Sequence, residues 1–243
     1  MKNKILLIVE GEVDEKKFFK KIGKINKDFE LEIFPFKTNL YELYKEIEKY
    51  DFDTDTITIL QERKNSEKET IVLRNNFAYI YLIFDCDLQD NHYKNNLDIL
   101  IKMVNYFDDP TENGKLLINY PMLESYRDID LNNENDFLKR YVNVNELSKY
   151  KQIVNERGNP ANINTYDWPL FLKLVKVNLL KITHLLQKKN KIIEYDEYLN
   201  KITQEKILSY QLGCIKEDYL YILNCGILIL IDYFGEKLYN KLK

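Results

Sequence analysis

Residues 4–9 read KILLIV, a run of mostly branched apolar residues that ends at Glu10-Gly11. A second run of this kind, AYIYLIF at residues 78–84, ends at Asp85. Apolar residues at consecutive rather than alternate positions are typical of strands buried on both faces, as in a parallel sheet. The two runs therefore predict the centre of an α/β sheet.

Two weaker strands and several helices are expected around this centre. Residues 30–36 alternate between apolar and polar side chains as a strand does, and residues 115–118 form a further short strand. Apolar residues recur at helical spacing in the intervening segments, where Thr38 or Asn39 can cap a helix. The polar stretch at residues 61–70 indicates a long loop or an exposed hairpin. This alternation predicts a mainly parallel, Rossmann-like sheet flanked by helices.

The pattern changes to successive helices after about residue 145. Apolar residues recur at helical spacing in residues 167–187, 195–202 and 219–238. No Gly/Ser-rich linker separates the two regions, so a helical region of residues 146–243 is expected to pack on an α/β domain of residues 1–145. We also expect residues 219–238 to offer a face to a partner protein or to a second copy of the chain.

The composition excludes several classes of protein. Of the 243 residues, 45% are hydrophobic and 31% are charged, a balance that excludes a disordered chain. No apolar run approaches the roughly 20 residues that span a bilayer, and no signal peptide is recognisable. The three widely spaced cysteines indicate reduced, buried thiols in a cytoplasmic protein.

The net charge of −3 conceals an uneven distribution along the chain. Residues 85–136 carry 12 acidic and 4 basic side chains, whereas residues 137–243 carry 11 acidic and 17 basic ones. An acidic patch beside a basic region suits a metal-dependent enzyme that acts on nucleic acid, although solvated helices give the same pattern. No Gly-x-x-x-x-Gly-Lys loop is present, so any dependence on ATP must come from a partner.

Carboxylates stand where the two strongest strands end. Glu10 follows the first, and Asp85 and Asp87 follow the second. Ligands bind at the carboxyl ends of parallel strands, and converging like charges call for a neutralising cation. Oxygen ligands without histidine or cysteine favour Mg²⁺ or Mn²⁺ over zinc. Asp14 is four residues from Glu10 and can reach the same ion, but it reads equally well as a helix N-terminal charge, and Asp87 as a turn residue.

These residues lie in motifs that resemble those of TOPRIM domains. Leu7-Ile8-Val9-Glu10-Gly11-Glu12-Val13-Asp14 is similar to the first TOPRIM motif, and Phe84-Asp85-Cys86-Asp87 is similar to the Asp-x-Asp motif. The stretch from Asn119 to Tyr126, NYPMLESY, resembles the acidic motif of bacterial defence proteins related to the OLD nucleases. The resemblance covers about residues 4–130.

The resemblance implies an activity and a site. It implies a Mg²⁺-dependent endonuclease that acts as a toxic effector in bacterial anti-phage defence (abortive infection), controlled by an ABC- or AAA-type ATPase encoded nearby. Glu10, Asp85 and Asp87 would be catalytic, and the metal ligands would be Glu10 with Asp14, Asp85 with Asp87, and Glu124. The sequence identifies no catalytic lysine.

Four basic residues are candidates for contacts with a nucleic-acid backbone: Lys115, Arg127, Lys188 and Lys189. Each reads equally well as an ordinary surface charge. Two other functions stay open at this point. One is a non-catalytic subunit that uses the same fold to dock on an ATPase. The other is a primase-like nucleotidyl transferase, which the lack of a preceding zinc-binding module disfavours.

Overall fold

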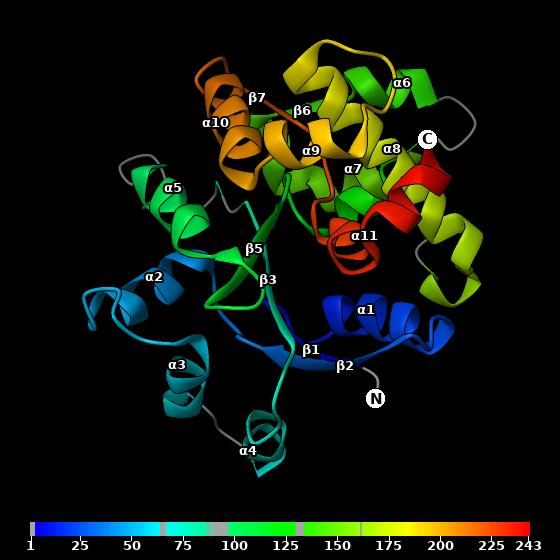
Figure 1. Ribbon diagram of the computed structural model, residues 1–243. Coiled ribbons are helices and arrows are strands. Elements are labelled where there is room, and N and C mark those ends of the chain that lie inside the picture. The colour runs from blue at the N-terminus through cyan, green and yellow to red at the C-terminus, as the bar shows by residue number, and fades with distance from the viewer. Residues whose placement is uncertain (1–2, 64–66, 87, 89–96, 130–133, 161) are drawn as a thin grey trace. The chain divides into compact units, whose positions relative to one another are not determined.

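The computed structural model describes residues 3–63, 67–86, 88, 97–129, 134–160 and 162–243 (Figure 1). The chain forms two compact units, and each consists of two stretches of sequence. The first unit contains Met1–Phe84 and Asp98–Leu117. The second contains Asp85–Leu97 and Ile118–Lys243. The chain therefore passes from one unit to the other three times.

A five-stranded sheet contains the two strongly apolar runs in neighbouring strands. Its order is β2-β1-β3-β5-β4, and β1 is parallel to both of its neighbours. The strands are β1 (Asn3–Val9), β2 (Phe29–Pro35), β3 (Tyr79–Asp85), β4 (Asp108–Asp109) and β5 (Gly114–Asn119). The short edge strand β4 is antiparallel to β5. The predicted α/β class with a mainly parallel sheet is confirmed.

The centre of this sheet is dry because β1 is apolar on both faces. The five residues from Ile5 to Val9 have no exposed surface, and Tyr81, Leu82 and Phe84 of β3 are equally buried. Helix α1 (Asp14–Ile25) has an acidic first turn and buries Phe18, Phe19 and Ile22. This burial is expected, because apolar residues stand at every position of the strands and at every third or fourth position of the helix.

The other helices of the first unit follow β2 and β3. They are α2 (Leu40–Glu48), α3 (Thr56–Arg63), α4 (Glu67–Leu73) and α5 (Leu97–Tyr106). The Asn39 side chain caps α2 by accepting a hydrogen bond from the Glu42 amide, as predicted. The loop or hairpin predicted at residues 61–70 was wrong, because α3 and α4 occupy its described ends. These helices are short, and α3 buries only Thr56, Ile59 and Leu60, so its apolar pattern is weak.

The second unit is mostly helical. Its helices are α6 (Glu134–Lys139), α7 (Tyr150–Arg157), α8 (Trp168–Gln187), α9 (Tyr195–Lys201), α10 (Gln204–Ile215) and α11 (Ile229–Leu242). Short 3-10 helices also occur: η2 (Leu123–Tyr126), η3 (Val144–Lys149), η4 (Ile163–Thr165) and η5 (Gly226–Leu228). The 20-residue helix α8 begins at an Asp167 cap followed by Pro169 and ends at Lys188, which adopts the left-handed conformation with φ of 55°.

Two short strands, β6 (Tyr141–Asn143) and β7 (Tyr219–Tyr221), form an antiparallel pair in the second unit. The continuous helical pattern predicted for residues 219–238 was therefore wrong at its start. Every residue from Leu220 to Ile231 except Tyr221 is buried within the chain. This burial covers most of the apolar side chains in the segment, while Tyr233 and Phe234 are partly exposed. The partner-binding face at residues 219–238 stays a prediction.

The division of the chain also differs from the expected boundary at residue 145. Residues 118–145 belong with the C-terminal half, because Tyr120 forms a β-bridge with Leu223 and β6 pairs with β7. Cys86, Cys214 and Cys225 are buried free thiols, as predicted. None of the helices in the described ranges is long and apolar enough to cross a membrane.

Candidate functional site

Glu10 lies at the carboxyl end of the central strand β1, where the chain order of the sheet reverses. From β1 the chain proceeds to β2 on one side, while β3 lies on the other. The Glu10 amide donates to the Ile83 carbonyl at 3.2 Å, and its carbonyl accepts from the Lys37 amide at 2.9 Å. The backbone of Glu10 is thus fixed on both sides at the position where open parallel sheets bind their ligands.

Lys37 lies beside this position in the loop after β2 and was missed by the sequence analysis. Its Nζ forms ion pairs with Glu12 at 3.0 Å and with Glu69 at 3.3 Å. Hydrogen bonds to these two carboxylates raise the pKa of Lys37, so it is a cation at neutral pH. Its φ of 68° is in the left-handed region, which is uncommon for a residue other than glycine and often marks a functional site.

Asp14 is the first residue of α1 and lies on the surface. Its Oδ1 is 3.6 Å from Lys17 Nζ one turn later, and both side chains are well exposed. A carboxylate in the first turn of a helix also interacts favourably with the helix dipole. Both observations account for Asp14 as a helix N-terminal charge.

Asp85 ends β3 and is held by a buried amide of the neighbouring strand. Asn119 at the end of β5 has no exposed surface, and its Nδ2 lies 3.4 Å from Asp85 Oδ1. The Asn119 carbonyl accepts from the Cys86 amide at 2.9 Å, and its Oδ1 accepts from the Gly226 amide at 3.0 Å. Asp87 lies outside the described residues.

The segment around Gly226 is fixed by a second buried amide. The Asn224 side chain donates to the Leu123 carbonyl at 3.0 Å and to Ser125 Oγ at 3.1 Å. Its backbone amide donates to Asn178 Oδ1 of α8 at 2.8 Å. We call Asn119, Ser125, Asn178 and Asn224 the polar junction. It holds the loop after β5 against a segment roughly a hundred residues later, and buried amides are stable there because they are hydrogen-bonded.

Glu124 lies in η2, and its carboxylate is largely buried. Its Oε1 is 2.9 Å from Lys151 Nζ at the start of α7, and its side chain is 13% exposed. In this structure Glu124 is an ion-pair partner of Lys151.

The donor set at the strand ends suits a hard cation. Glu10 and Asp85 are half-buried carboxylates, and Mg²⁺ and Mn²⁺ prefer such oxygen ligands. Within the described ranges, no three His, Cys, Asp or Glu side chains gather closely enough to hold a metal ion. Asp87, the third carboxylate of the predicted set, is not among those residues. The fit to a metal therefore rests on the donor chemistry of the carboxylates that end the strands.

The four basic residues predicted to contact nucleic acid have different surroundings. Lys115 is at the amino end of β5, opposite Asp108, so about 13 Å of strand separates it from Asn119. Arg127 is buried and donates to the Asn159 carbonyl and to Asn155 Oδ1, both at 3.1 Å. Lys188 lies over the Tyr210 ring at 5.2 Å, and Lys189 pairs with Glu197 at 2.7 Å.

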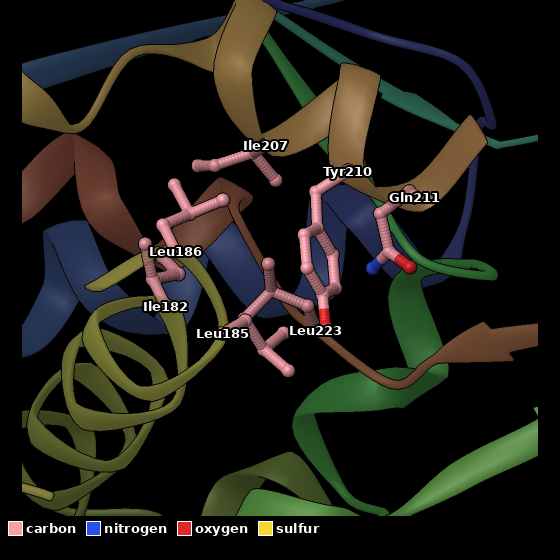
Figure 2. Close-up of a pocket in the computed structure, with 7 residues that line it drawn as sticks. All are labelled: Ile182, Leu185, Leu186, Ile207, Tyr210, Gln211 and Leu223. Atoms are coloured by element: carbon pink, nitrogen blue, oxygen red, sulfur yellow. The ribbon is translucent and has the colours of Figure 1, made fainter. Parts of the chain in front are cut away.

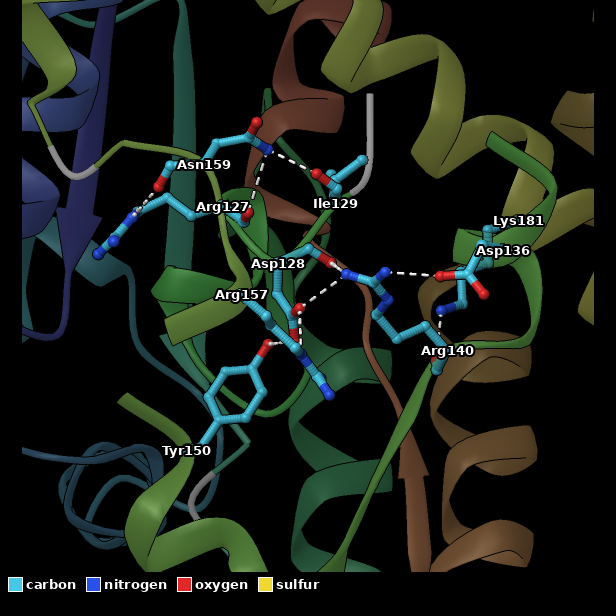
Figure 3. Close-up of polar contacts among 9 residues, drawn as sticks. All are labelled: Arg127, Asp128, Ile129, Asp136, Arg140, Tyr150, Arg157, Asn159 and Lys181. Atoms are coloured by element: carbon cyan, nitrogen blue, oxygen red, sulfur yellow. Dashed lines mark hydrogen bonds and ion pairs between the residues drawn. The ribbon is translucent and has the colours of Figure 1, made fainter. Parts of the chain in front are cut away.

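A buried ionic cluster forms around Asp128 and was not predicted from the sequence (Figure 3). The Asp128 carboxylate has no exposed surface. It accepts from Arg157 Nε at 2.8 Å and Nη2 at 2.7 Å, and from Arg140 Nη1 and the Tyr150 hydroxyl at 3.1 Å each. Hydrogen bonding to Asp128 raises the pKa of Arg157 further. The carboxylate thus fixes two guanidinium groups in place.

Lys181 of α8 is buried beside this cluster. Its Nζ donates to the Arg140 carbonyl at 2.6 Å and lies 4.1 Å from the centroid of the Phe137 ring. Burial lowers the pKa of Lys181 well below that of an exposed lysine, because the charged form loses its hydration.

A small cavity between α8 and α10 carries no chemistry (Figure 2). Its volume is about 10 Å³, at the lower limit for one water molecule. Gln211 lines it, but its amide group exchanges hydrogen bonds with the backbone of Tyr221 at 2.8 and 3.1 Å. The remaining lining is apolar or aromatic: Ile182, Leu185, Leu186, Ile207, Tyr210 and Leu223. The cavity is therefore a packing space.

The fold and the strand-end residues together define a Rossmann-like α/β protein with acidic side chains at the point where the strand order reverses. No protein-family model matches the chain, and no solved structure matches it. An uncharacterized protein of Methanocaldococcus jannaschii is 27% identical over 183 residues, which are 75% of this chain and 32% of the relative. The chain thus spans about a third of the length of that relative.

Proposed function

We propose that the chain is a TOPRIM-type nuclease that hydrolyses phosphodiester bonds in DNA or RNA with Mg²⁺ or Mn²⁺. One observation carries this proposal. Carboxylates end two adjacent parallel strands, Glu10 after β1 and Asp85 in β3, where the strand order of the sheet reverses. Acidic residues at this position are what a metal-dependent phosphodiester enzyme needs.

Each residue has a specific role in this proposal. Glu10, Asp85 and Asp87 would hold the cation, which would activate a water and offset negative charge on the leaving oxygen. Asn119 orients Asp85 by donating to its Oδ1. Lys37 is the candidate for contact with the phosphate, since its backbone is bonded directly to that of Glu10. Glu10 also provides a carboxylate that can accept a proton from the attacking water.

The test is a Glu10→Gln variant, compared with Glu30→Gln on β2 as a matched control. Gln keeps the size of the side chain but lacks the negative charge. Calorimetry with Mn²⁺ and cleavage of labelled single- and double-stranded DNA and RNA are measured on both variants. We expect Glu10→Gln to lose metal affinity and cleavage while its thermal unfolding stays normal, and Glu30→Gln to behave as wild type. If Glu10→Gln still cuts, the assigned role of Glu10 is wrong.

We extend the proposal to control by a partner ATPase and to a toxic role in anti-phage defence. The chain has no phosphate-binding loop of its own, and the resemblance to defence nucleases supports a separate energy source. Expression with and without the ATPase encoded nearby, followed by co-purification and phage plating, tests this extension. If the wild-type chain is not toxic and co-purifies with no partner under any condition, the defence role is wrong. The nuclease proposal would then depend on the cleavage assay alone.

A non-catalytic binding subunit is the second candidate, and the environment of Lys37 favours it. Lys37 forms ion pairs with Glu12 and Glu69 beside Glu10, so the negative charge at this edge of the first unit is partly compensated by the chain itself. The metal titration separates the two functions. A binding subunit would show the same weak Mn²⁺ affinity in wild type and in Glu10→Gln.

A further inference from the structure

The second unit has an open hollow bounded by basic side chains. Its volume is about 300 Å³, the size of the smallest ligand pockets. It is formed by the end of α6, the start of β6 and the end of α7. The lining residues are Asp136, Lys139, Arg140, Tyr141 and Arg157. Because all five belong to one unit, the hollow is complete within it.

The two arginines of this hollow are fixed by hydrogen bonds to the buried carboxylate of Asp128. Buried Asp128 binds Arg157 through Nε and Nη2 and binds Arg140 through Nη1 (Figure 3). Nη1 of Arg157 bonds to no described residue, and the side chain is 41% exposed. A guanidinium whose orientation is already fixed loses little entropy when it binds a ligand. Arg157 is thus preorganised to donate hydrogen bonds into the hollow.

The charge of the hollow favours an anion. Among the lining residues, Lys139, Arg140 and Arg157 carry three positive charges against one negative charge on Asp136. Asp128 behind the arginines and Glu146 near Arg157 reduce this excess without lining the hollow. Asp136 already pairs with Arg140 Nη2 at 2.6 Å. Lys139 is exposed, and none of the described residues forms an ion pair with it. A phosphodiester group would pair with the cations of this lining.

An exposed aromatic ring lies beside these cations. Tyr141 is 50% exposed. Its ring is supported by Tyr219 and Tyr221 of β7, with centroids 5.4 and 6.4 Å away. A supported tyrosine next to a phosphate-binding cation is how proteins bind single strands, since every base can stack on a ring.

We propose that this hollow binds a segment of single-stranded nucleic acid, with a phosphate on Lys139 and Arg157 and a base stacked on Tyr141. The inference rests on the proposed function in one respect, since it assigns to the second unit the strand that the nuclease would cut. Double-stranded nucleic acid does not fit this arrangement, because its bases are already stacked on one another.

Binding is tested with a fluorescently labelled 12-nucleotide single strand in EDTA, so that no metal-dependent cleavage occurs. The variants are Lys139→Glu and Tyr141→Leu, with Lys237→Glu on α11 as a control of equal charge change. We expect Tyr141→Leu to weaken binding by about 5- to 150-fold, the loss typical of one stacked base. Tyr141→Phe keeps the ring and should restore affinity. Lys139→Glu removes a cation from the hollow, so it should weaken binding and lower the slope of log affinity against log salt by at least about 0.7, the value for one phosphate contact.

The outcomes separate this inference from the proposed function. If both variants bind as tightly as wild type and as Lys237→Glu, or if wild type binds no single strand, the inference is wrong whatever the cleavage assay shows. If the variants lose binding while wild type shows no metal-dependent cleavage, the strand site stands and the nuclease proposal fails. Competition by adenosine monophosphate as strong as by the unlabelled strand would also overturn the inference, because it would indicate a mononucleotide site. Circular dichroism confirms that each variant is folded.

Discussion

Asp128 illustrates how one buried charge depends on its partners. Four hydrogen bonds from three residues converge on a carboxylate that has no contact with solvent. Removing its charge would leave Arg140 and Arg157 close together without compensation. We predict that Asp128→Asn lowers the free energy of unfolding by about 3–5 kcal/mol, the usual cost of breaking a buried ion pair from one side.

Asp136 provides the control for this prediction. It pairs with the same Arg140, but its side chain is 53% exposed. Asp136→Asn should cost at most about 1 kcal/mol, since solvent screens exposed pairs. Urea unfolding of both variants measures the contrast, and equal losses would show that burial is not the source of the effect.

Lys181 makes stability depend on pH in a predictable direction. Burial lowers the pKa of Lys181 in the folded state, while in the unfolded chain its pKa returns to the ordinary value of 10.5. Between these two values the unfolded chain binds one more proton, so folded stability rises as the pH rises. A Lys181→Met variant lacks this contribution.

The stability of Lys181→Met relative to wild type should therefore decrease as the pH rises toward 10.5. The slope cannot exceed about 1.4 kcal/mol per pH unit for a single group. Urea unfolding of both proteins at a series of pH values from 6 to 10 measures it. A stability difference that is constant across this range would mean that Lys181 titrates alike in the folded and unfolded chains.

At the scale of elements, Gly114 limits how β5 can begin. Its φ is 110°, and a Cβ at this position would lie 2.7 Å from Leu82 Cδ1 of β3. Gly114→Ala should destabilise the protein by about 2–3 kcal/mol through backbone strain and overpacking. Gly213 in α10 is the matched control, because an added Cβ meets nothing within 4 Å. Gly213→Ala should stabilise by roughly 0.5 kcal/mol, and thermal unfolding of the pair tests both signs.

The strands of the sheet could be predicted because their signal is local. The apolar runs of β1 and β3 predict that both strands are buried. The ends of these runs also predict that Glu10 and Asp85 lie at the carboxyl ends of the strands. The helix α4 and the strand β7 could not be predicted in this way. A three-residue strand such as Tyr219–Tyr221 is too short to show the alternation of apolar and polar residues that identifies a strand. The strand β7 forms because it pairs with β6.

The candidate site was predictable only in part for the same reason. Lys37 stands out because it forms ion pairs with Glu12 and Glu69. Asp128 stands out because it forms ion pairs with Arg140 and Arg157. Neither set of partners is close in sequence, so no motif contains them. The distribution of charge along the sequence indicated a basic C-terminal region. Only the folded structure shows that Lys189 forms an ion pair with Glu197, whereas Lys139 forms none with the described residues.

At the scale of the whole molecule, the two units are interleaved along the chain, so neither is a continuous fragment. A fragment of residues 1–145 would keep β6 without β7 and Tyr120 without its bridge to Leu223. We predict that this fragment shows no cooperative thermal transition. Co-expression with residues 146–243 should restore a folded complex, because all broken contacts can form again between the two pieces. A cooperative transition for the fragment alone would contradict the prediction.

The polar junction also sets when the loop after β5 can complete its packing during synthesis on the ribosome. The bond between Asn119 and Gly226 joins residues 107 positions apart. At about 5–20 residues per second, translation of that interval takes about 5–20 s. The strands β1, β2 and β3 leave the ribosome before this delay begins, but Asn119 and Tyr120 lack their partners Gly226 and Leu223 until the delay ends. The start of the loop after β5 thus stays incompletely packed on the nascent chain for several seconds, which makes it the expected binding site for a cellular chaperone.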